Sequence, residues 1–263
     1  EASPMSYQFK QALTRLPGPN FAQGLTNAQL GAPDLETALV QHAAYCTALR
    51  RCGLDVQTLP ADPDHPDSTF VEDTAVLSAN TTIVTRPGAA SRQGEVGAIL
   101  GALRALGREA QCITAPGTVD GGDICQAERH FFIGLSARTN ADGAMQLARL
   151  LRAHGYTSST VDIRDNRGLL HLKSGITYLG QGRLVLAPEL APVAEFRDYE
   201  LVRVESAESY AANCVRINDH VLIADGYPQL ASSLRALGYA LMPLAISEFR
   251  KMDGGLSCLS LRF

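Results

Sequence analysis

The sequence lacks several features that mark common functional classes. None of its six cysteines forms a C-x-x-C pair, and the formal net charge is only −4 over 263 residues. Without a C-x-x-C pair, a zinc ribbon or a thioredoxin-type redox motif is disfavoured. A mildly acidic chain also argues against non-specific nucleic-acid binding, which needs a basic surface. We therefore expect neither a redox domain nor a nucleic-acid partner.

Long apolar runs are also absent. No stretch of ~18 uninterrupted apolar residues occurs, so we expect no membrane span, and the first residues form no apolar core of a signal peptide. Free thiols in a reducing cytosol are then the default, which predicts a cytoplasmic protein. Residues 1–4 precede Met5 and are expected to be an addition to the natural chain.

A repeated unit is present instead. Four segments combine an amphipathic helix of 3.6-residue period, a glycine suited to a left-handed cap, and then a strand. Paired apolar runs joined by turn residues alternate with these segments and predict hairpins. The helices end at Gly53, Gly107, Gly155 and Gly238, and the hairpins begin at Ala75, Ile124, Ile176 and Cys214.

The two chain ends complete this pattern. The run Cys258–Phe263 has no partner downstream and the run Tyr7–Leu13 has none upstream, so their pairing would close a ring of five units. Five ββαβ units around a pseudo-fivefold axis resemble the pentein fold, an α/β propeller. We therefore expect a single catalytic domain over residues 1–263, with the active site in the central channel; an ordinary open α/β sheet is the alternative.

Three residues in separate polar clusters could form a catalytic site. Cys258 follows Gly254 and Gly255 closely, His171 lies between two leucines on a predicted strand, and Asp120 precedes a Gly-Gly turn. Thiol, imidazole and carboxylate are the parts of a Cys–His–acid site. A structural thiol, a core histidine and an Asx turn explain the same residues locally. Spacing does not decide, because such sites are defined by spatial role.

Other charged residues indicate the ligand. Asp67, Glu72 and Asp73 adjoin a predicted core strand, where unpaired acids are costly to bury, so they suit a cationic planar group or else a solvated loop. Arg92 and Arg138 lie near the entries to two helices, where they could hold a carboxylate or face solvent. A ligand with a guanidinium at one end and a carboxylate at the other is arginine or a derivative.

Six segments together resemble the dimethylarginine dimethylaminohydrolases. They are Asp67–Asp73, Gly117–Asp123, Gly134–Asn140, His171–Ser174, Glu208–Cys214 and Asp253–Phe263. The resemblance runs from Leu25 to Phe263. It implies hydrolysis of asymmetric dimethylarginine and monomethylarginine to citrulline and dimethylamine or methylamine, through a covalent thiouronium on cysteine. It implies no cofactor and no metal.

The resemblance also implies roles for single residues. Cys258 is then the nucleophile, His171 the general acid and base, and Asp120 the acid that orients His171. The implied substrate contacts are Asp67, Glu72 and Asp73 at the guanidine, Arg92 and Arg138 at the carboxylate, and the backbone of Leu25 and Met252 at the amino-acid end.

Several alternatives stay open at this point. An arginine deiminase on the same fold would release ammonia, and a catalytically silent arginine- or peptide-binding protein would release nothing. The preferred methylation state is not determined, nor is the oligomeric state, for which a homodimer is one choice. Residues 18–29, rich in glycine, proline and asparagine, could form a lid over the site.

Overall fold

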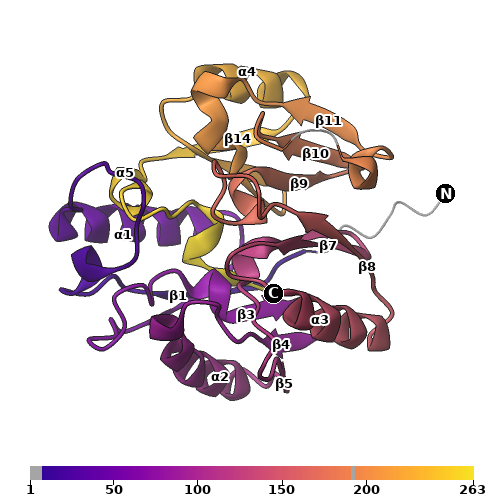
Figure 1. The fold of residues 1–263 in the computed structure, drawn as a ribbon. Helices are drawn as coiled ribbons and strands as arrows, with labels where there is room; N and C mark the ends of the chain where they lie inside the picture. The colour runs from indigo at the N-terminus through magenta and orange to yellow at the C-terminus, as the bar shows by residue number, and fades with distance from the viewer. Residues whose placement is uncertain (1–7, 191–192) are drawn as a thin grey trace.

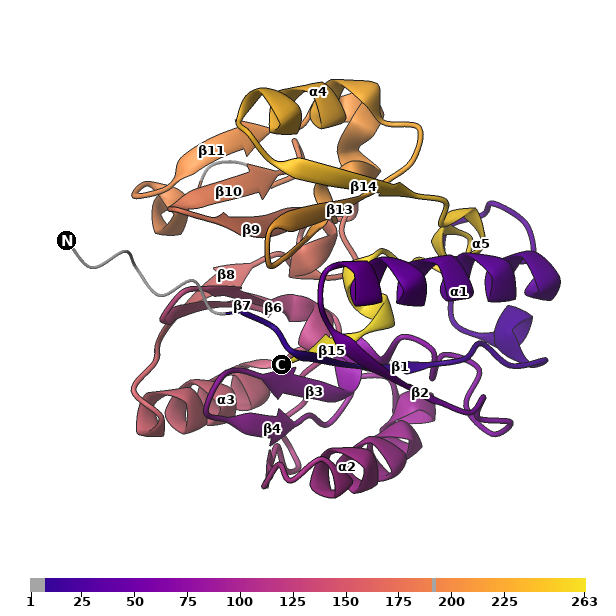
Figure 2. The same ribbon diagram turned by 180° about the vertical axis from the view of Figure 1, so that it is seen from behind.

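Five three-stranded sheets make up the described part of the chain, residues 8–190 and 193–263 of a computed structural model. In each sheet the middle strand pairs antiparallel with one neighbour and parallel with the other. Four of the sheets are β3 (Ala75–Leu77), β4 (Thr82–Val84) and β5 (Gln111–Cys112); β6 (Ile124–Ala127), β7 (His130–Leu135) and β8 (Thr157–Asp162); β9 (Ile176–Gly180), β10 (Arg183–Leu186) and β11 (Glu200–Arg203); and β12 (Val215–Ile217), β13 (His220–Ala224) and β14 (Ala240–Leu244). Figures 1 and 2 show the sheets around a common centre with the helices outside.

The fifth sheet joins the two ends of the chain, as predicted. Strand β1 (Gln11–Arg15) pairs antiparallel with β15 (Leu261–Arg262) and parallel with β2 (Asp55–Leu59). The last strand is shorter than expected, because Ser257–Leu259 form a 3-10 turn, η8, in which the Cys258 N–H bonds back to the Gly255 carbonyl at 3.2 Å. Cys258 therefore lies on a turn and not in a strand. Tyr7 and residues 1–4 lie outside the described residues.

Four α-helices connect the middle and third strands of four sheets. They are α1 (Leu35–Arg51), α2 (Val96–Ala105), α3 (Ala141–Ala153) and α4 (Pro228–Ala236). The side chains of Asp34 and Asn140 cap α1 and α3 by accepting from backbone N–H groups of the first turn. The predicted glycines follow the four helices with φ between 75° and 92°, a region that favours glycine.

The sheet β9–β11 departs from the predicted unit in one element. Between β10 and β11 the described residues contain a 3-10 turn, Ala194–Phe196, and no α-helix. Pro188 and Pro192 lie in this connection, and each removes a backbone donor that a helix would use. The ring of five units is confirmed, with a helix in four of them.

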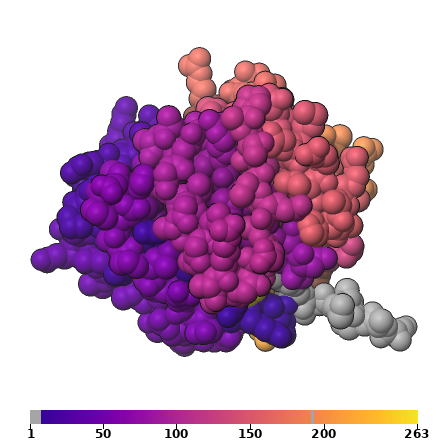
Figure 3. All heavy atoms as spheres, turned by 90° about the horizontal axis from the view of Figure 1, so that it is seen from below, coloured from indigo at the N-terminus to yellow at the C-terminus, as the bar shows by residue number. Residues whose placement is uncertain are grey.

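Apolar clusters fill the spaces between neighbouring units. In one of them, Leu13 of β1 and Leu261 of β15 pack with Val84 and Leu103 of the next unit. The view from below shows mainly residues of the first half of the chain, with little of the C-terminal segment at the surface (Figure 3). The turn that carries Cys258 is largely buried, since Ser257 and Leu259 on either side of it are 4% and 1% exposed. Among the described residues, no helix has both the length and the apolar character that a bilayer crossing requires.

Candidate active site

Short 3-10 turns precede the first strand of each unit and meet inside the ring. Turn η2 (Val71–Thr74) contacts both η4 (Gly121–Asp123) and η8, and η4 contacts η5 (Leu172–Ser174). These turns carry or adjoin the acids, the histidine and the cysteine singled out in the sequence. His171 directly precedes η5 with an extended backbone of φ −130° and ψ 159°, and it belongs to no strand, contrary to the prediction.

Cys258 and His171 share one site. Both line a cavity of about 330 Å³, together with Tyr210 and Asn213. Both also line an adjoining smaller cavity of about 30 Å³. The predicted convergence of a C-terminal thiol and a mid-chain imidazole is therefore present in the fold.

The imidazole of His171 is held by one of the two candidate aspartates. Its Nε2 lies 2.9 Å from Asp120 Oδ2, and Asp120 is fully buried. Asp123 instead accepts from the hydroxyls of Ser136 and Thr139 and from the Leu172 N–H at 3.0 Å. Asp120 thus contacts the ring, whereas Asp123 fixes the backbone that follows His171.

The smaller cavity gathers most of the residues predicted to bind substrate. Leu25, Asp67, Asp73, Arg92, Arg138 and Met252 line it. The Leu25 N–H donates to both oxygens of Asp67, at 3.0 and 3.2 Å, which ties the segment 18–29 to the cavity wall. Carboxylates and guanidinium groups therefore line one space together with Cys258.

Arg92 and Arg138 differ in how fully they are engaged. Arg92 is buried, and its donors reach Asp73 at 2.5 Å, Glu95 at 2.8 and 3.0 Å, and two backbone carbonyls. Arg138 is partly exposed, and its Nη1 lies 3.6 Å from Asp120 Oδ2. Arg138 is thus better placed to meet an incoming carboxylate, whereas Arg92 would have to exchange an existing contact.

Comparisons with known proteins give the family. A family model described as N,N dimethylarginine dimethylhydrolase, eukaryotic, matches residues 26–209. The Pseudomonas aeruginosa protein named N(G),N(G)-dimethylarginine dimethylaminohydrolase is 43% identical over 256 residues, which is 97% of this chain and 100% of that protein. The chain belongs to the dimethylarginine dimethylaminohydrolase family. The protein of the same name from Streptomyces coelicolor is 35% identical and covers 96% of this chain and 96% of its own length.

Solved structures agree with this assignment. A cysteine-to-serine variant of DDAH from Pseudomonas aeruginosa, complexed with citrulline, superposes with a TM-score of 0.94 at 42% identity, covering 98% of this chain and 100% of that chain. The N-terminal domain of ArgZ superposes with a TM-score of 0.85 at 20% identity, covering 96% of this chain and 97% of that chain, which shows a shared fold alone. The pentein-type ring predicted from the repeats is confirmed.

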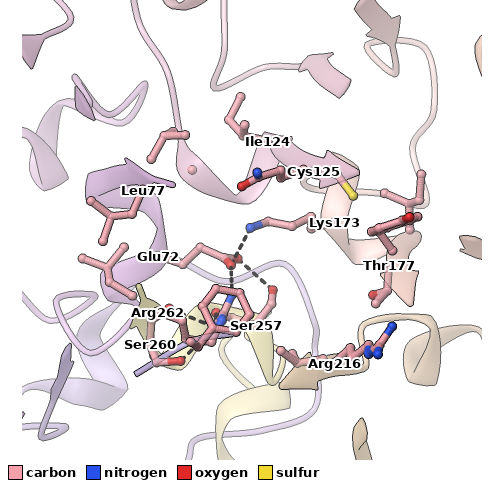
Figure 4. Close-up of a pocket in the computed structure, with 18 of the residues that line it drawn as sticks. Glu72, Leu77, Ile124, Cys125, Lys173, Thr177, Arg216, Ser257, Ser260 and Arg262 are labelled. Atoms are coloured by element: carbon pink, nitrogen blue, oxygen red, sulfur yellow. Dashed lines mark hydrogen bonds and ion pairs between the residues drawn. The ribbon is translucent and has the colours of Figure 1, made fainter. Parts of the chain in front are cut away.

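Glu72 has hydrogen-bond partners that were not predicted from the sequence. Its carboxylate accepts from Lys173 Nζ at 2.5 Å, from Ser257 Oγ at 2.7 Å and from Arg262 Nη2 at 3.3 Å. Figure 4 shows these three side chains converging on Glu72 at a third cavity, of about 160 Å³. Glu72, Lys173 and Ser257 line both this cavity and the larger one that holds Cys258. The predicted contact of Glu72 with the guanidine stays a prediction.

Charge distribution sets the protonation of the histidine. Burial lowers the pKa of His171, but the carboxylates of Asp73, Asp123 and Asp120 outweigh it and raise that pKa to about 9. The His171 cation and Arg92, against the opposing effect of burial, lower the pKa of Asp73 to about 2. At neutral pH the dimethylarginine dimethylaminohydrolase site therefore holds an imidazolium, which can act as an acid.

The Cys258 thiol, unlike the imidazole of His171, is uncharged at neutral pH. Burial of the sulfur, together with the carboxylates of Glu72 and Asp73, raises the pKa of Cys258 to about 12. The Gly255 N–H, 3.4 Å from Sγ, acts against this shift. The free protein thus keeps a neutral thiol, and a cation placed beside the sulfur would favour the thiolate.

This protonation state predicts how alkylation of Cys258 depends on pH. Below its pKa the thiolate fraction grows about tenfold per pH unit. We therefore expect the rate of iodoacetamide labelling, followed by mass spectrometry of the Cys258 peptide, to keep rising from pH 7 to pH 10. A Cys258→Ser variant gives the background from other thiols, including exposed Cys112. A plateau reached below pH 8 would contradict a raised pKa.

Three groups in the site could also contact a metal ion. Ligand atoms of Asp73, Asp120 and His171 lie within 4.8 Å of one another. Both carboxylates already face a guanidinium, Arg92 for Asp73 and Arg138 for Asp120. Because these arginines already offset the negative charge that would attract a cation, the arrangement gives no specific support to a metal centre.

Proposed function

We propose that this protein hydrolyses Nω-methylated arginines, asymmetric dimethylarginine and monomethylarginine, to citrulline and dimethylamine or methylamine. The observation that carries the proposal is the shared cavity of Cys258 and the His171–Asp120 pair in a member of this family. Relatives have been solved with citrulline and, for a histidine-to-glycine variant of a dimethylarginine dimethylaminohydrolase, as an adduct with S-methyl-L-thiocitrulline. Citrulline is the proposed product, and the thiocitrulline adduct resembles the proposed cysteine-linked intermediate.

The substrate would lie with its guanidinium near the acids and its carboxylate near Arg138. Asp73 is buried and ionised at neutral pH, since its pKa is lowered to about 2, so it can orient a bound cation. Leu25, Asp67 and Met252 line the same small cavity as Asp73. The contact of Asp67 with the guanidine, and those of the Leu25 and Met252 backbone with the amino-acid end, stay predictions. Arg92 stabilises Asp73, and its direct contact with the carboxylate stays a prediction.

The first half-reaction needs a thiolate and an acid. Binding of the guanidinium offsets the negative charge that contributes to the raised Cys258 pKa, so the thiol proton passes to solvent water and the sulfur can attack the central guanidine carbon. The imidazolium of His171 donates its proton to the methylated nitrogen as the carbon–nitrogen bond breaks. Neutral amine departs, and a thiouronium remains on Cys258.

The second half-reaction uses the same two residues in reverse. Neutral His171 takes a proton from water, whose oxygen attacks the thiouronium carbon. The carbon–sulfur bond breaks with its electrons returning to the Cys258 sulfur, and the carbon keeps the new oxygen as the ureido carbonyl of citrulline. The remaining hydroxyl proton passes through solvent to the sulfur and restores the neutral thiol. Asp120 keeps the imidazole in one orientation through both steps.

Product analysis tests the proposal. Purified protein is incubated with asymmetric dimethylarginine, monomethylarginine and unmethylated arginine, and citrulline, methylamines and ammonia are quantified separately. We expect citrulline with an equal amount of methylamine or dimethylamine. Ammonia from free arginine as the main product would favour an arginine deiminase, and citrulline from none of the three would overturn the assignment. A cytoplasmic location and a homodimer stay predictions.

Replacing Asp120 by asparagine should slow turnover without preventing it. The asparagine Oδ1 can still accept from His171, but the carboxylate charge that strengthens this hydrogen bond is lost, and with it most of the about 1.5–3 kcal/mol that a hydrogen bond to a charged group contributes. That corresponds to a fall in kcat of roughly 10- to 100-fold, with little change in KM because Asp120 holds the imidazole and not the substrate. Steady-state citrulline formation measures both constants. If Asp120→Asn keeps the kcat of the wild type, Asp120 serves only to form the turn and does not assist His171.

A further inference from the structure

We infer that Asn213 is a positioning residue that clamps the turn carrying Cys258 to the turn following His171. Its side chain makes hydrogen bonds with both. The Asn213 Nδ2 group donates to the Lys173 carbonyl at 2.7 Å and to Ser257 Oγ at 2.9 Å, and its Oδ1 accepts from the Ser257 N–H at 3.0 Å. Lys173 is two residues after His171, and Ser257 directly precedes Cys258.

The position of Asn213 in the ring explains why it can join these turns. It ends the 3-10 turn η7 (Ser206–Ala212), which precedes the sheet β12–β14. Lys173 belongs to the preceding unit and Ser257 to the unit that closes the ring. One buried side chain thus links three neighbouring units at the point where the two catalytic side chains face one cavity.

The chemistry of the contacts requires an amide. Two acceptors, the Lys173 carbonyl and Ser257 Oγ, face Nδ2, while one donor, the Ser257 N–H, faces Oδ1. Ser257 Oγ uses its own proton to donate to Glu72, so it can only accept from Asn213. An aspartate at 213 matches the size of asparagine but can donate neither of the two bonds.

Close packing adds to the fit. A Cβ atom on Gly255 would lie 2.4 Å from Asn213 Oδ1, so the glycine lets the backbone before Cys258 approach the amide. The same turn places the Gly255 N–H 3.4 Å from Cys258 Sγ. Asn213 therefore acts on the reaction through the Cys258 turn, by holding the sulfur in line with the guanidine carbon and against this N–H.

Asn218 provides a matched control elsewhere in the fold. Its side chain also makes two donor bonds and one acceptor bond, with the Phe9 and Cys52 carbonyls and the Phe9 N–H, at 2.9–3.0 Å. It lies between β12 and β13 and lines neither cavity that holds Cys258. Asn218→Asp thus removes the same kind of bonds without touching the catalytic turns.

The inference rests on the proposed function and predicts a split between kcat and KM. Displacement of a reacting group by about 1 Å can cost roughly 100-fold in rate, so we expect Asn213→Asp and Asn213→Ala to lower kcat by ~100-fold with little change in KM. Asn218→Asp should lower the melting temperature but leave kcat near that of the wild type. Equal losses of kcat in the Asn213 and Asn218 variants, or a wild-type kcat in the Asn213 variants, would overturn the inference.

A second measurement separates the clamp from the proposed reaction. Iodoacetamide labelling of Cys258 needs no substrate, and we expect it to be several-fold slower in Asn213→Ala because the thiolate loses the Gly255 N–H. If the wild type forms no citrulline, the proposed function fails, and the role of Asn213 is then tested by labelling alone. Labelling of Asn213→Ala at the wild-type rate would overturn the inference about Asn213. So would unfolding of both Asn213 variants while Asn218→Asp stays folded, since Asn213 would then be a structural residue.

Discussion

Replacing Cys258 by serine is expected to abolish turnover while the protein stays folded. The hydroxyl is a far weaker acid than a thiol, and the burial and carboxylates that raise the Cys258 pKa to about 12 would disfavour an alkoxide as well. Loss of a nucleophile in comparable sites costs up to ~10⁶ in kcat, so citrulline formation should fall at least ~10⁴-fold. Rates are measured with enzyme at high concentration and amine release recorded independently.

The matched control for this variant is Cys46→Ser. Cys46 is buried, whereas Cys258 is half-buried, and Cys46 lies in α1 beside the hydroxyls of Thr14 and Thr58, which can pair with a serine. We expect Cys46→Ser to keep its turnover. Citrulline binding by Cys258→Ser, followed by calorimetry, verifies that its site is intact. A rate for Cys258→Ser within tenfold of the wild type would remove the nucleophile from the mechanism.

The fold could be predicted because its signals are local. Each helix of the repeat shows its own 3.6-residue period, and the glycines at 53, 107, 155 and 238 take the left-handed conformation expected of them. The pairing of β1 with β15 followed from counting units, since both end runs lacked a partner. The missing helix between β10 and β11 also has a local cause, because the sequence there contains Pro188 and Pro192, and proline lacks the backbone N–H that a helix uses.

The site was less predictable because its contacts join residues far apart in the chain. No local pattern distinguishes Asp120 from Asp123, which flank the same glycines, yet one faces His171 and the other the Leu172 N–H. The partners of Glu72 come from positions 173, 257 and 262, about 100 to 190 residues away. Lys173 and Asn213 stood within motifs that resembled the family, which was the available signal for both.

The second large effect is expected for His171→Gly. Without the imidazole, the methylated nitrogen leaves unprotonated in the first step and water keeps its proton in the second. General acid–base catalysis contributes about 10²–10⁴ to a rate, and because two steps lose it, we expect a fall in kcat at the upper end of that range. His42→Gln is the control, since His42 is also buried but lies in α1, away from the cavity.

The pH profile makes this prediction specific to the histidine. Because Asp73, Asp123 and Asp120, against the effect of burial, raise the pKa of His171 to about 9, the imidazolium persists through neutral pH and is lost above pH 9. The wild-type kcat/KM should therefore decline on the alkaline side as this acid deprotonates, and that decline should be missing from the residual activity of His171→Gly. An unchanged alkaline limb in the variant would assign the proton transfer to another group, and unchanged turnover would remove His171 from the chemistry altogether.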